Sequence, residues 1–179
     1  MVLKNMNNKN ETERNKLEMR IVLFRTVALG LIFLGAIVYM FAKPDISCVV
    51  HGRSMYPTFN EGDEVVAQKV KDTSEILRYD IVAVNTHRKY QNNLIKRVVG
   101  LPKETIRISK TGKVYVNDQE MVDCYGYWSE PMLATEELVI ELEEDEFFVL
   151  GDNINNSTDS REKEIGAIHM KDILGVVKE

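Results

Sequence analysis

Three polar segments hold the residues best suited to chemistry. The first, 52–59 (GRSMYPTF), contains Ser54, the second, 96–102 (KRVVGLP), begins with Lys96, and the third, 151–161 (GDNINNSTDSR), is a dense polar loop. A serine hydroxyl is a weak nucleophile that needs a base, and a lysine with a neutral amine is the alternative to histidine. Burial among apolar side chains lowers a lysine pKa toward this state. Together the segments predict serine–lysine nucleophilic chemistry.

The polar loop contains side chains that can hold a lysine amine in place. The hydroxyls of Ser157 and Ser160 are both candidates to orient Lys96. Asp159 and Arg161 carry opposite charges and are expected to form a pair that shapes the loop. Taken singly, each segment is ordinary turn or strand composition, so the hypothesis requires that the fold bring them together.

The position of Lys96 within a strand bears on its burial. Lys96 and Arg97 are adjacent, and adjacent side chains of a strand point to opposite faces. If Arg97 faces water, Lys96 faces the apolar side. His51 lies close to Ser54 in the sequence and offers a Ser/His pair as the alternative.

Short strands dominate the chain after Pro44, and they must position these segments. Apolar and β-branched residues alternate or cluster over 65–70, 80–85, 94–100, 105–110, 113–117, 137–142 and 146–152. The dipeptide Thr111-Gly112 predicts a hairpin turn, and the range 72–77 allows one short helical turn. The pattern predicts an all-β domain, barrel-like or sandwich-like.

An uncharged stretch near the amino terminus has the length of a membrane span. Residues 26–42 (TVALGLIFLGAIVYMFA) carry no charge, and residues 21–24 extend the apolar run. As a helix this stretch reaches about 26 Å, enough for a bilayer core when Arg25 snorkels. A core helix would keep a polar stripe and a cleaved signal would end in small residues, and neither is present. We expect an uncleaved anchor.

The charges flanking this span predict its orientation. Lys16, Arg20 and Arg25 precede it, whereas only Lys43 follows closely. Basic residues near a span are retained in the cytoplasm. We therefore expect a cytoplasmic tail over 1–20, a transmembrane anchor over 21–43 and an extracytoplasmic domain over 44–179, in the cell membrane.

Charge and length bound the function. The 179 residues allow one ordinary domain plus the anchor. Residues 44–179 carry sixteen basic and twenty-five acidic side chains, which argues against tight nucleic-acid binding. Seven acidic residues fall within 136–146, where a solvated strand edge fits better than a calcium site. Cys48 and Cys124 are compatible with a disulfide or with two free thiols.

The motifs GRSMYPTF, IKRVVGLP and GDNINNSTDSR, in this order behind a single anchor, resemble the signature boxes of the type I signal peptidases. The resemblance extends over most of residues 21–179. It implies an all-β catalytic domain of coiled antiparallel sheet that hydrolyses the peptide bond after a small-x-small signal, without metal or cofactor. It also implies a nucleophile and oxyanion donor at Ser54, a general base at Lys96, an orienting hydroxyl at Ser157 and supporting side chains at Asp159 and Arg161.

Three positions depart from the family pattern. Gly52 stands where some members carry a serine that donates to the oxyanion, so this chain resembles the Gram-positive-like members, which lack that serine. A missing donor costs about 2.7–4 kcal/mol of barrier unless another group replaces it. Lys103-Glu104 replaces the usual Gly-Asp, and Ile154 replaces an arginine. The chain is also short, which implies a compact domain without the large second domain of Gram-negative members. A dedicated paralogue that serves surface pilins is compatible with these departures.

The leading hypothesis is a membrane-bound serine endopeptidase that removes N-terminal signal peptides from exported preproteins. Its expected partners are preproteins with small-x-small cleavage sites, membrane lipid and, in the dedicated case, pilin subunits. A non-catalytic pilin-assembly factor with the same fold is the alternative, although this chain keeps Ser54 and Lys96. A soluble self-cleaving repressor shares the serine–lysine chemistry, but it would lack the anchor.

Two further groups are candidates for substrate or membrane contact. Met55 follows Ser54 directly and is a candidate to line a pocket that admits only small side chains. Aromatic and apolar residues surround Trp128, and this group is compatible with a membrane interface, a substrate groove or a small satellite core: Tyr125, Tyr127, Pro131 and Met132.

Overall fold

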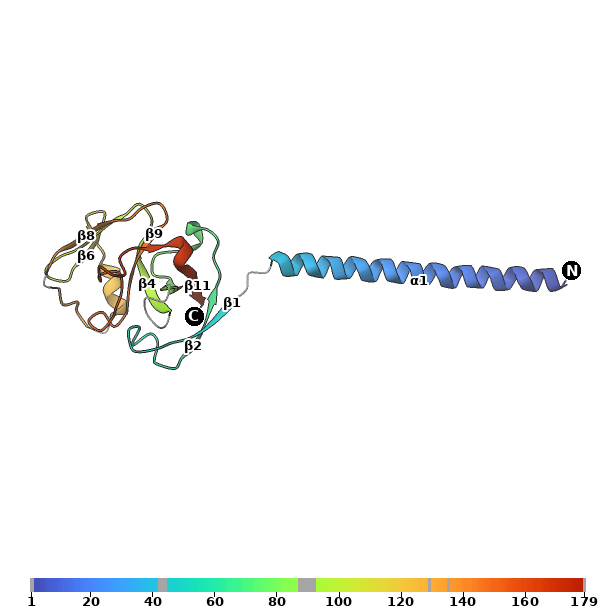
Figure 1. The fold of residues 1–179 in the computed structure, drawn as a ribbon, viewed down its shortest axis with the longest axis horizontal. Helices are drawn as coiled ribbons and strands as arrows, with labels where there is room; N and C mark the ends of the chain where they lie inside the picture. Colours follow the sequence, from blue (N-terminus) through green and yellow to red (C-terminus); the bar gives the residue numbers. More distant parts are fainter. Residues whose placement is uncertain (1, 42–44, 87–92, 129, 135, 179) are drawn as a thin grey trace. The chain divides into compact units, whose positions relative to one another are not determined.

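The computed structural model describes residues 2–41, 45–86, 93–128, 130–134 and 136–178. They fall into two units, residues 1–42 and 43–179, a single long helix α1 (Val2–Phe41) and a β domain (Figure 1). Within α1 the stretch Lys16–Ile37 is long and apolar enough to cross a membrane, and none of it is buried in protein. This length and composition fit a membrane span.

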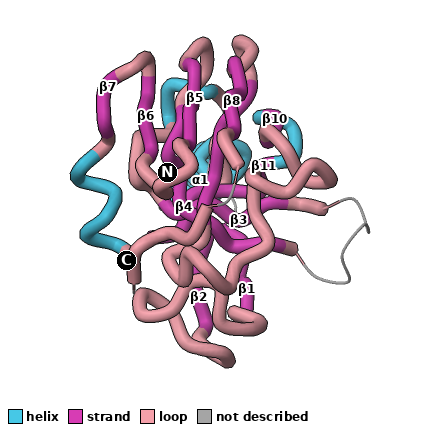
Figure 2. Tube along the Cα trace, turned by 90° about the vertical axis from the view of Figure 1, so that its left-hand side faces the viewer, coloured by secondary structure: helices cyan, strands magenta, loops and turns pink. Residues whose placement is uncertain are grey.

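The β domain consists of two antiparallel sheets, which confirms the all-β class. Seven strands form the first sheet in the order β1-β2-β11-β3-β4-β9-β10, and four form the second in the order β7-β6-β5-β8 (Figure 2). The first sheet contains β1 (Asp45–Val49), β2 (Glu64–Gln68), β3 (Ile81–Val84), β4 (Leu94–Gly100), β9 (Glu146–Leu150), β10 (Ile168–His169) and β11 (Ile173–Lys178). The second contains β5 (Thr105–Ile108), β6 (Val114–Val116), β7 (Gln119–Glu120) and β8 (Leu138–Glu141).

Irregular pairing curls the first sheet. The register shifts between Val98 and Gly100 where β4 meets β9, and between Ile173 and Gly175 where β11 meets β3. An extra residue in one strand bends it and increases the local twist, so these shifts produce the coiled antiparallel sheet that was expected.

All seven predicted strands are present, as β2, β3, β4, β5, β6, β8 and β9. The predicted turn at Thr111-Gly112 joins β5 to β6, and Gly112 has φ +76°, a conformation that favours glycine. The predicted helical turn is a short 3-10 helix, Thr73–Glu75, whose first turn is capped by the Asp72 carboxylate. Two more 3-10 helices lie at Val122–Tyr127 and Met170–Asp172.

The two sheets meet at the end of β4. A side chain at Gly100 would collide with the side chains of Ile106 of the second sheet and of Leu142, so these side chains pack directly against the β4 backbone here. One buried cluster joins both sheets and includes Val99, Phe148 and Ile106. β4 therefore lies at the centre of the domain, and its residues 95–100 are all buried.

Two open questions about the sequence are answered by the fold. Cys48 and Cys124 are free thiols, and Cys124 Sγ donates a hydrogen bond to the Met121 carbonyl at 2.8 Å. Burial raises the pKa of the Cys48 thiol. The acidic range 136–146 includes β8, which lies at the edge of the second sheet. This position agrees with the prediction that the acidic residues form a solvated strand edge.

Candidate active site

Ser54 and Lys96 meet inside the β domain. Ser54 lies in the loop between β1 and β2, and hydrogen bonds between Val50 and Asp63 and between Gly62 and Val50 close the base of this loop. Lys96 lies on β4, opposite Val82 of β3. Its Nζ is 2.7 Å from Ser54 Oγ, and the residue is only 1% exposed.

Burial changes the protonation of Lys96. Desolvation lowers the pKa of its amine from 10.5 to about 8, against the opposing pull of the Asp159 and Asp152 carboxylates. The amine also donates to the Ile95 carbonyl at 2.8 Å. A substantial fraction of Lys96 is therefore neutral slightly above neutral pH, whereas an exposed lysine is not.

Arg97 is buried, whereas the sequence argument for a buried Lys96 was that Arg97 faces water on the opposite side of the strand. It is 4% exposed, and its guanidinium holds both oxygens of the Asp152 carboxylate at 2.8 and 2.6 Å. Arg97 also donates to the Tyr79 carbonyl and stacks on the Tyr127 ring, 3.9 Å from its centre. The pair with Asp152 thus balances the positive charge of Arg97 inside the protein. Burial of Lys96 therefore does not require Arg97 to be exposed.

The Asp152 carboxylate connects all three sequence motifs. It pairs with Arg97 next to Lys96, it accepts a hydrogen bond from the Thr58 hydroxyl of the serine segment, and it belongs to the polar loop. The sequence alone gives no role to Arg97, Asp152 or Thr58. The sequence signal that could have found the Arg97–Asp152 pair is that these two residues carry opposite charges and lie in two different motifs.

A second ion pair holds the polar loop. The predicted Asp159–Arg161 pair is present, with Arg161 Nε 2.8 Å from Asp159 Oδ1. Asp159 also accepts from the Gly151 backbone N–H at 3.0 Å, and Arg161 donates to the Ile154 carbonyl at 2.6 Å. Ser160 binds the backbone of β9, because its hydroxyl accepts from the Val149 N–H at 3.0 Å. Ser160 thus anchors the loop to the sheet.

Ser157 lies close to Gly151. Its Oγ is buried and has no hydrogen-bond partner among the described residues. A side chain at Gly151 would collide with both the Ser157 Oγ and the Ser54 carbonyl oxygen. Ser157 is therefore brought close to Ser54, with a hydroxyl that is not used by the rest of the described fold.

Backbone contacts fix the orientation of Ser54. Its carbonyl accepts from the Asn153 N–H at 3.0 Å, and the Asn153 side chain donates to the Arg53 carbonyl at 2.9 Å. The Ser54 N–H donates to no acceptor in the described part of the chain. It can therefore donate to a substrate oxyanion.

The neighbours of Ser54 in the sequence have different environments. His51 is exposed, and no hydrogen bond between it and Ser54 is found among the described residues. Gly52 has φ +76°, a region that L side chains rarely adopt, so the backbone itself disfavours a serine there. Met55 is buried at 1% exposure in a cluster with Val50 and Ile95.

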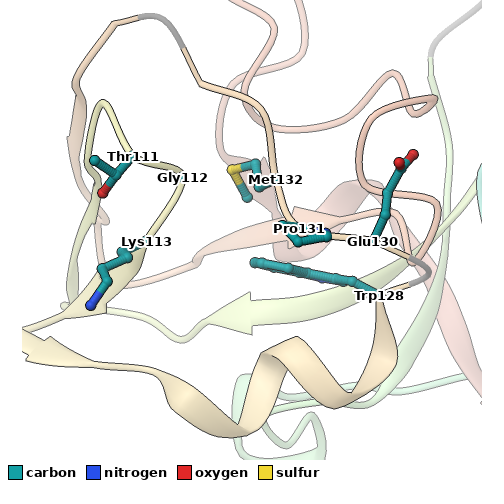
Figure 3. Close-up of a pocket in the computed structure, with 7 residues that line it drawn as sticks. All are labelled: Thr111, Gly112, Lys113, Trp128, Glu130, Pro131 and Met132. Atoms are coloured by element: carbon teal, nitrogen blue, oxygen red, sulfur yellow. The ribbon is translucent and has the colours of Figure 1, made fainter.

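The residues around Trp128 form both core and pocket. Met132 is buried in the main cluster, and the partly buried Trp128 packs against this cluster. Trp128, Pro131 and Met132 also line a pocket of about 450 Å³, which the hairpin residues Thr111 and Lys113 border from the other side (Figure 3). Tyr127 covers Arg97, and the Tyr125 side chain lies outside the described part of the chain.

This geometry has the parts of a nucleophilic hydrolase. An amine at hydrogen-bond distance from a serine hydroxyl can take its proton while the oxygen attacks a carbonyl carbon. An unengaged backbone N–H at the same serine can stabilise the negative oxygen that forms. Two ion pairs, the buried Arg97–Asp152 and the partly buried Arg161–Asp159, surround this centre.

Comparisons with a family model and with individual known proteins point to the same family. The model described as "Signal peptidase, peptidase S26" matches residues 19–179. Signal peptidase I U of Bacillus subtilis strain 168 is 30% identical over 181 residues, covering 95% of this chain and 91% of its own. Signal peptidase I P of Bacillus subtilis subsp. natto is 35% identical over 136 residues, covering 72% of each chain.

A solved structure is also similar. A crystal structure of a signal peptidase I from Enterococcus faecalis V583 matches with a TM-score of 0.46 and 25% identity, covering 62% of this chain and all of that one. The assignment depends on the sequence matches, which extend over most of the chain. The chain therefore belongs to the signal peptidase family, peptidase S26, as a type I signal peptidase, a serine peptidase of signal-peptide processing.

Proposed function

We propose that this protein is a membrane-bound serine endopeptidase that cleaves exported preproteins after a small-x-small signal, with Ser54 as nucleophile and Lys96 as general base. The observation that supports this most is the 2.7 Å separation of Lys96 Nζ and Ser54 Oγ at a lysine only 1% exposed. Burial gives the amine a pKa of about 8, within reach of neutral pH.

The proposed reaction proceeds through an acyl-enzyme. Ser54 Oγ forms a bond to the scissile carbonyl carbon while its proton moves to the neutral Lys96 amine. The oxyanion accepts from the Ser54 N–H. The C–N bond then breaks, and the Lys96 ammonium returns the proton to the leaving amine. Water, activated by the same amine, hydrolyses the ester and releases the signal peptide.

The remaining site residues receive positioning roles in this proposal. Ser157 is assigned the role of orienting the Lys96 amine, although its buried Oγ forms no hydrogen bond with any described residue, Lys96 included. Asp159 and Arg161 hold the loop that carries Ser157. Met55, buried beside Ser54, limits the space offered to the residue before the cut.

The proposed location is the cell membrane, with residues 1–20 cytoplasmic, 21–43 spanning and 44–179 extracytoplasmic. The apolar stretch Lys16–Ile37 of α1 and the basic residues before it support this arrangement. Protease added to intact cells should degrade the β domain and spare an amino-terminal epitope tag. Protection of the β domain would contradict the proposed orientation.

The function is tested by mapping the cut. The detergent-solubilised protein is mixed with an exported preprotein that carries an A-x-A site, and the products are identified by mass spectrometry. A single cut after A-x-A, absent in Ser54→Ala, is expected. Binding without cleavage would instead favour the non-catalytic assembly factor, and an unchanged cut with Ser54→Ala would exclude Ser54 as the nucleophile.

A further inference from the structure

A groove of about 620 Å³ lies beside the candidate active site. Leu133 and Ala134 line one wall, and Asn155, Ser157 and other residues of the polar loop line the opposite one. Leu133 is 80% exposed, so the groove offers apolar surface to a ligand. This groove is separate from the pocket beside Trp128, with which it shares Met132.

Hydrogen bonds hold the two walls together. Asn155 Oδ1 accepts from the Leu133 N–H at 2.8 Å, and Asn155 Nδ2 donates to the Pro131 carbonyl at 2.9 Å. A single side chain of the polar loop therefore binds the backbone of the facing wall at two points. The groove is consequently preformed, which reduces the entropy cost of binding.

The inner end of the groove adjoins Ser54. Ser157 lines the groove, and Gly151 is in close contact with both Ser157 Oγ and the Ser54 carbonyl oxygen. Through Ser157 and Gly151, the groove therefore comes close to the backbone of the residue that carries the nucleophile. A polypeptide that crosses Ser54 can therefore continue into this space.

The exposed rim of the groove carries unpaired acidic groups. Glu136 and Glu162 line it, and neither forms an ion pair with a described residue. The other charges are mostly compensated, since Arg161 pairs with Asp159 and Glu137 pairs with Arg107, which leaves Lys163 as the opposing charge. This balance disfavours an acidic ligand and suits neutral or basic side chains.

We propose that this groove binds the first residues of the mature segment, directly after the scissile bond, and that it favours neutral or basic side chains over acidic ones there. The inference rests on the proposed function, and it adds a specificity on the far side of the cut from the small-x-small signal.

The test uses peptides that share one A-x-A signal and differ only at the second to fourth residues after the cut, with Lys or Asp at these positions. The full-length protein in detergent should have a kcat/KM about three- to fivefold higher for the Lys peptide, the effect of two screened surface charges. The double variant Glu136→Gln/Glu162→Gln should lose this preference. The control Glu143→Gln/Glu144→Gln removes two acidic groups outside the groove and should keep it.

A second variant tests the wall without altering the acidic groups. Leu133→Lys should shift the preference toward the Asp peptide, whereas Leu77→Lys, at a leucine 64% exposed outside the groove, should not. Equal cleavage of both peptides by the wild type, or equal effects of groove and control variants, would overturn the inference and leave the proposed function intact. Failure to cut either peptide would overturn the proposed function and this inference with it.

Discussion

At the scale of single residues, Lys96 carries a conflict between stability and function. Burial of its amine disfavours the ammonium form and lowers its pKa to about 8. The unfolded chain, with a pKa near 10.5, binds more protons between these values, so stability rises with pH across this window and is reduced below it. The catalytic base of the proposal is thus a destabilising residue at neutral pH.

Lys96→Met should therefore abolish cleavage and stabilise the protein. The expected gain in free energy of unfolding at pH 7 is roughly 2–3 kcal/mol, because the variant no longer buries an amine that prefers to be charged. The gain should vanish above pH 10.5, where the wild-type amine is neutral in both states. Denaturation of the full-length chain in detergent, followed by the fluorescence of Trp128, measures this difference.

The matched control is Lys69→Met, at an exposed lysine. It should change the free energy of unfolding by no more than about 0.5 kcal/mol, as is typical of surface substitutions. A Lys96→Met variant less stable than the wild type at pH 7 would mean that the hydrogen bonds of the amine outweigh its desolvation.

At the scale of elements, the turn after β4 explains one departure from the family pattern. Lys103 has φ +68°, so the chain keeps the left-handed conformation for which the family uses glycine. Glu104 fixes this turn, because its carboxylate accepts from the Leu101 N–H and pairs with both terminal nitrogens of Arg78. The turn geometry is retained at the cost of local strain.

Lys103→Gly should therefore raise the free energy of unfolding by about 0.5–1 kcal/mol. Relief of the left-handed strain exceeds the extra entropy of glycine in the unfolded chain, and the exposed pair with Glu144 contributes little. Lys103→Ala, which keeps the strain and loses the same pair, is the control. Chemical denaturation of both variants decides the matter, since equal stabilities would show that the turn is unstrained.

Ile154 explains a second departure. The family arginine is replaced by a side chain with 0% exposure that packs in the main cluster with Phe148 and Leu150. Its carbonyl, and not its side chain, contacts Arg161. The substitution therefore serves packing beneath the polar loop.

The strands that could be predicted are those with clear alternation or continuous apolar runs, such as β4 and β9. β1 was missed because its alternation is short and polar, and β7 and β10, of two residues each, exist only through pairing with a neighbour. β11 contains Gly175, which weakens a strand pattern, yet the structure needs it because a side chain there would collide with the Gln68 carbonyl of β2.

At the scale of the whole molecule, the sequence could predict which motifs meet but not how they are joined. Ser54 and Lys96 could be predicted because each lies in a motif that resembles a signature box of the type I signal peptidases. The Arg97–Asp152 pair could not, since each residue alone is a common charged residue of a strand or turn. It becomes recognisable only when β4 and the loop after β9 are adjacent.

The same buried pairs set the protonation of the site. Asp159 and Asp152 both raise the pKa of Lys96, and each is paired with its own arginine. Pairing lets the loop keep two carboxylates near the amine without a larger increase in its pKa. The fold as a whole, more than any single contact, therefore holds the pKa of Lys96 close to neutral pH.

The most direct test of this account is the pH dependence of kcat/KM for cleavage of an A-x-A peptide by the full-length protein in detergent. The rate should fall on the acidic side with an apparent pKa of about 8, as Lys96 gains its proton, and no cleavage should remain in Lys96→Met at any pH. An acidic limb near 6.5, the ordinary value for histidine, or one near 10.5, the ordinary value for lysine, would contradict a buried Lys96 as the base.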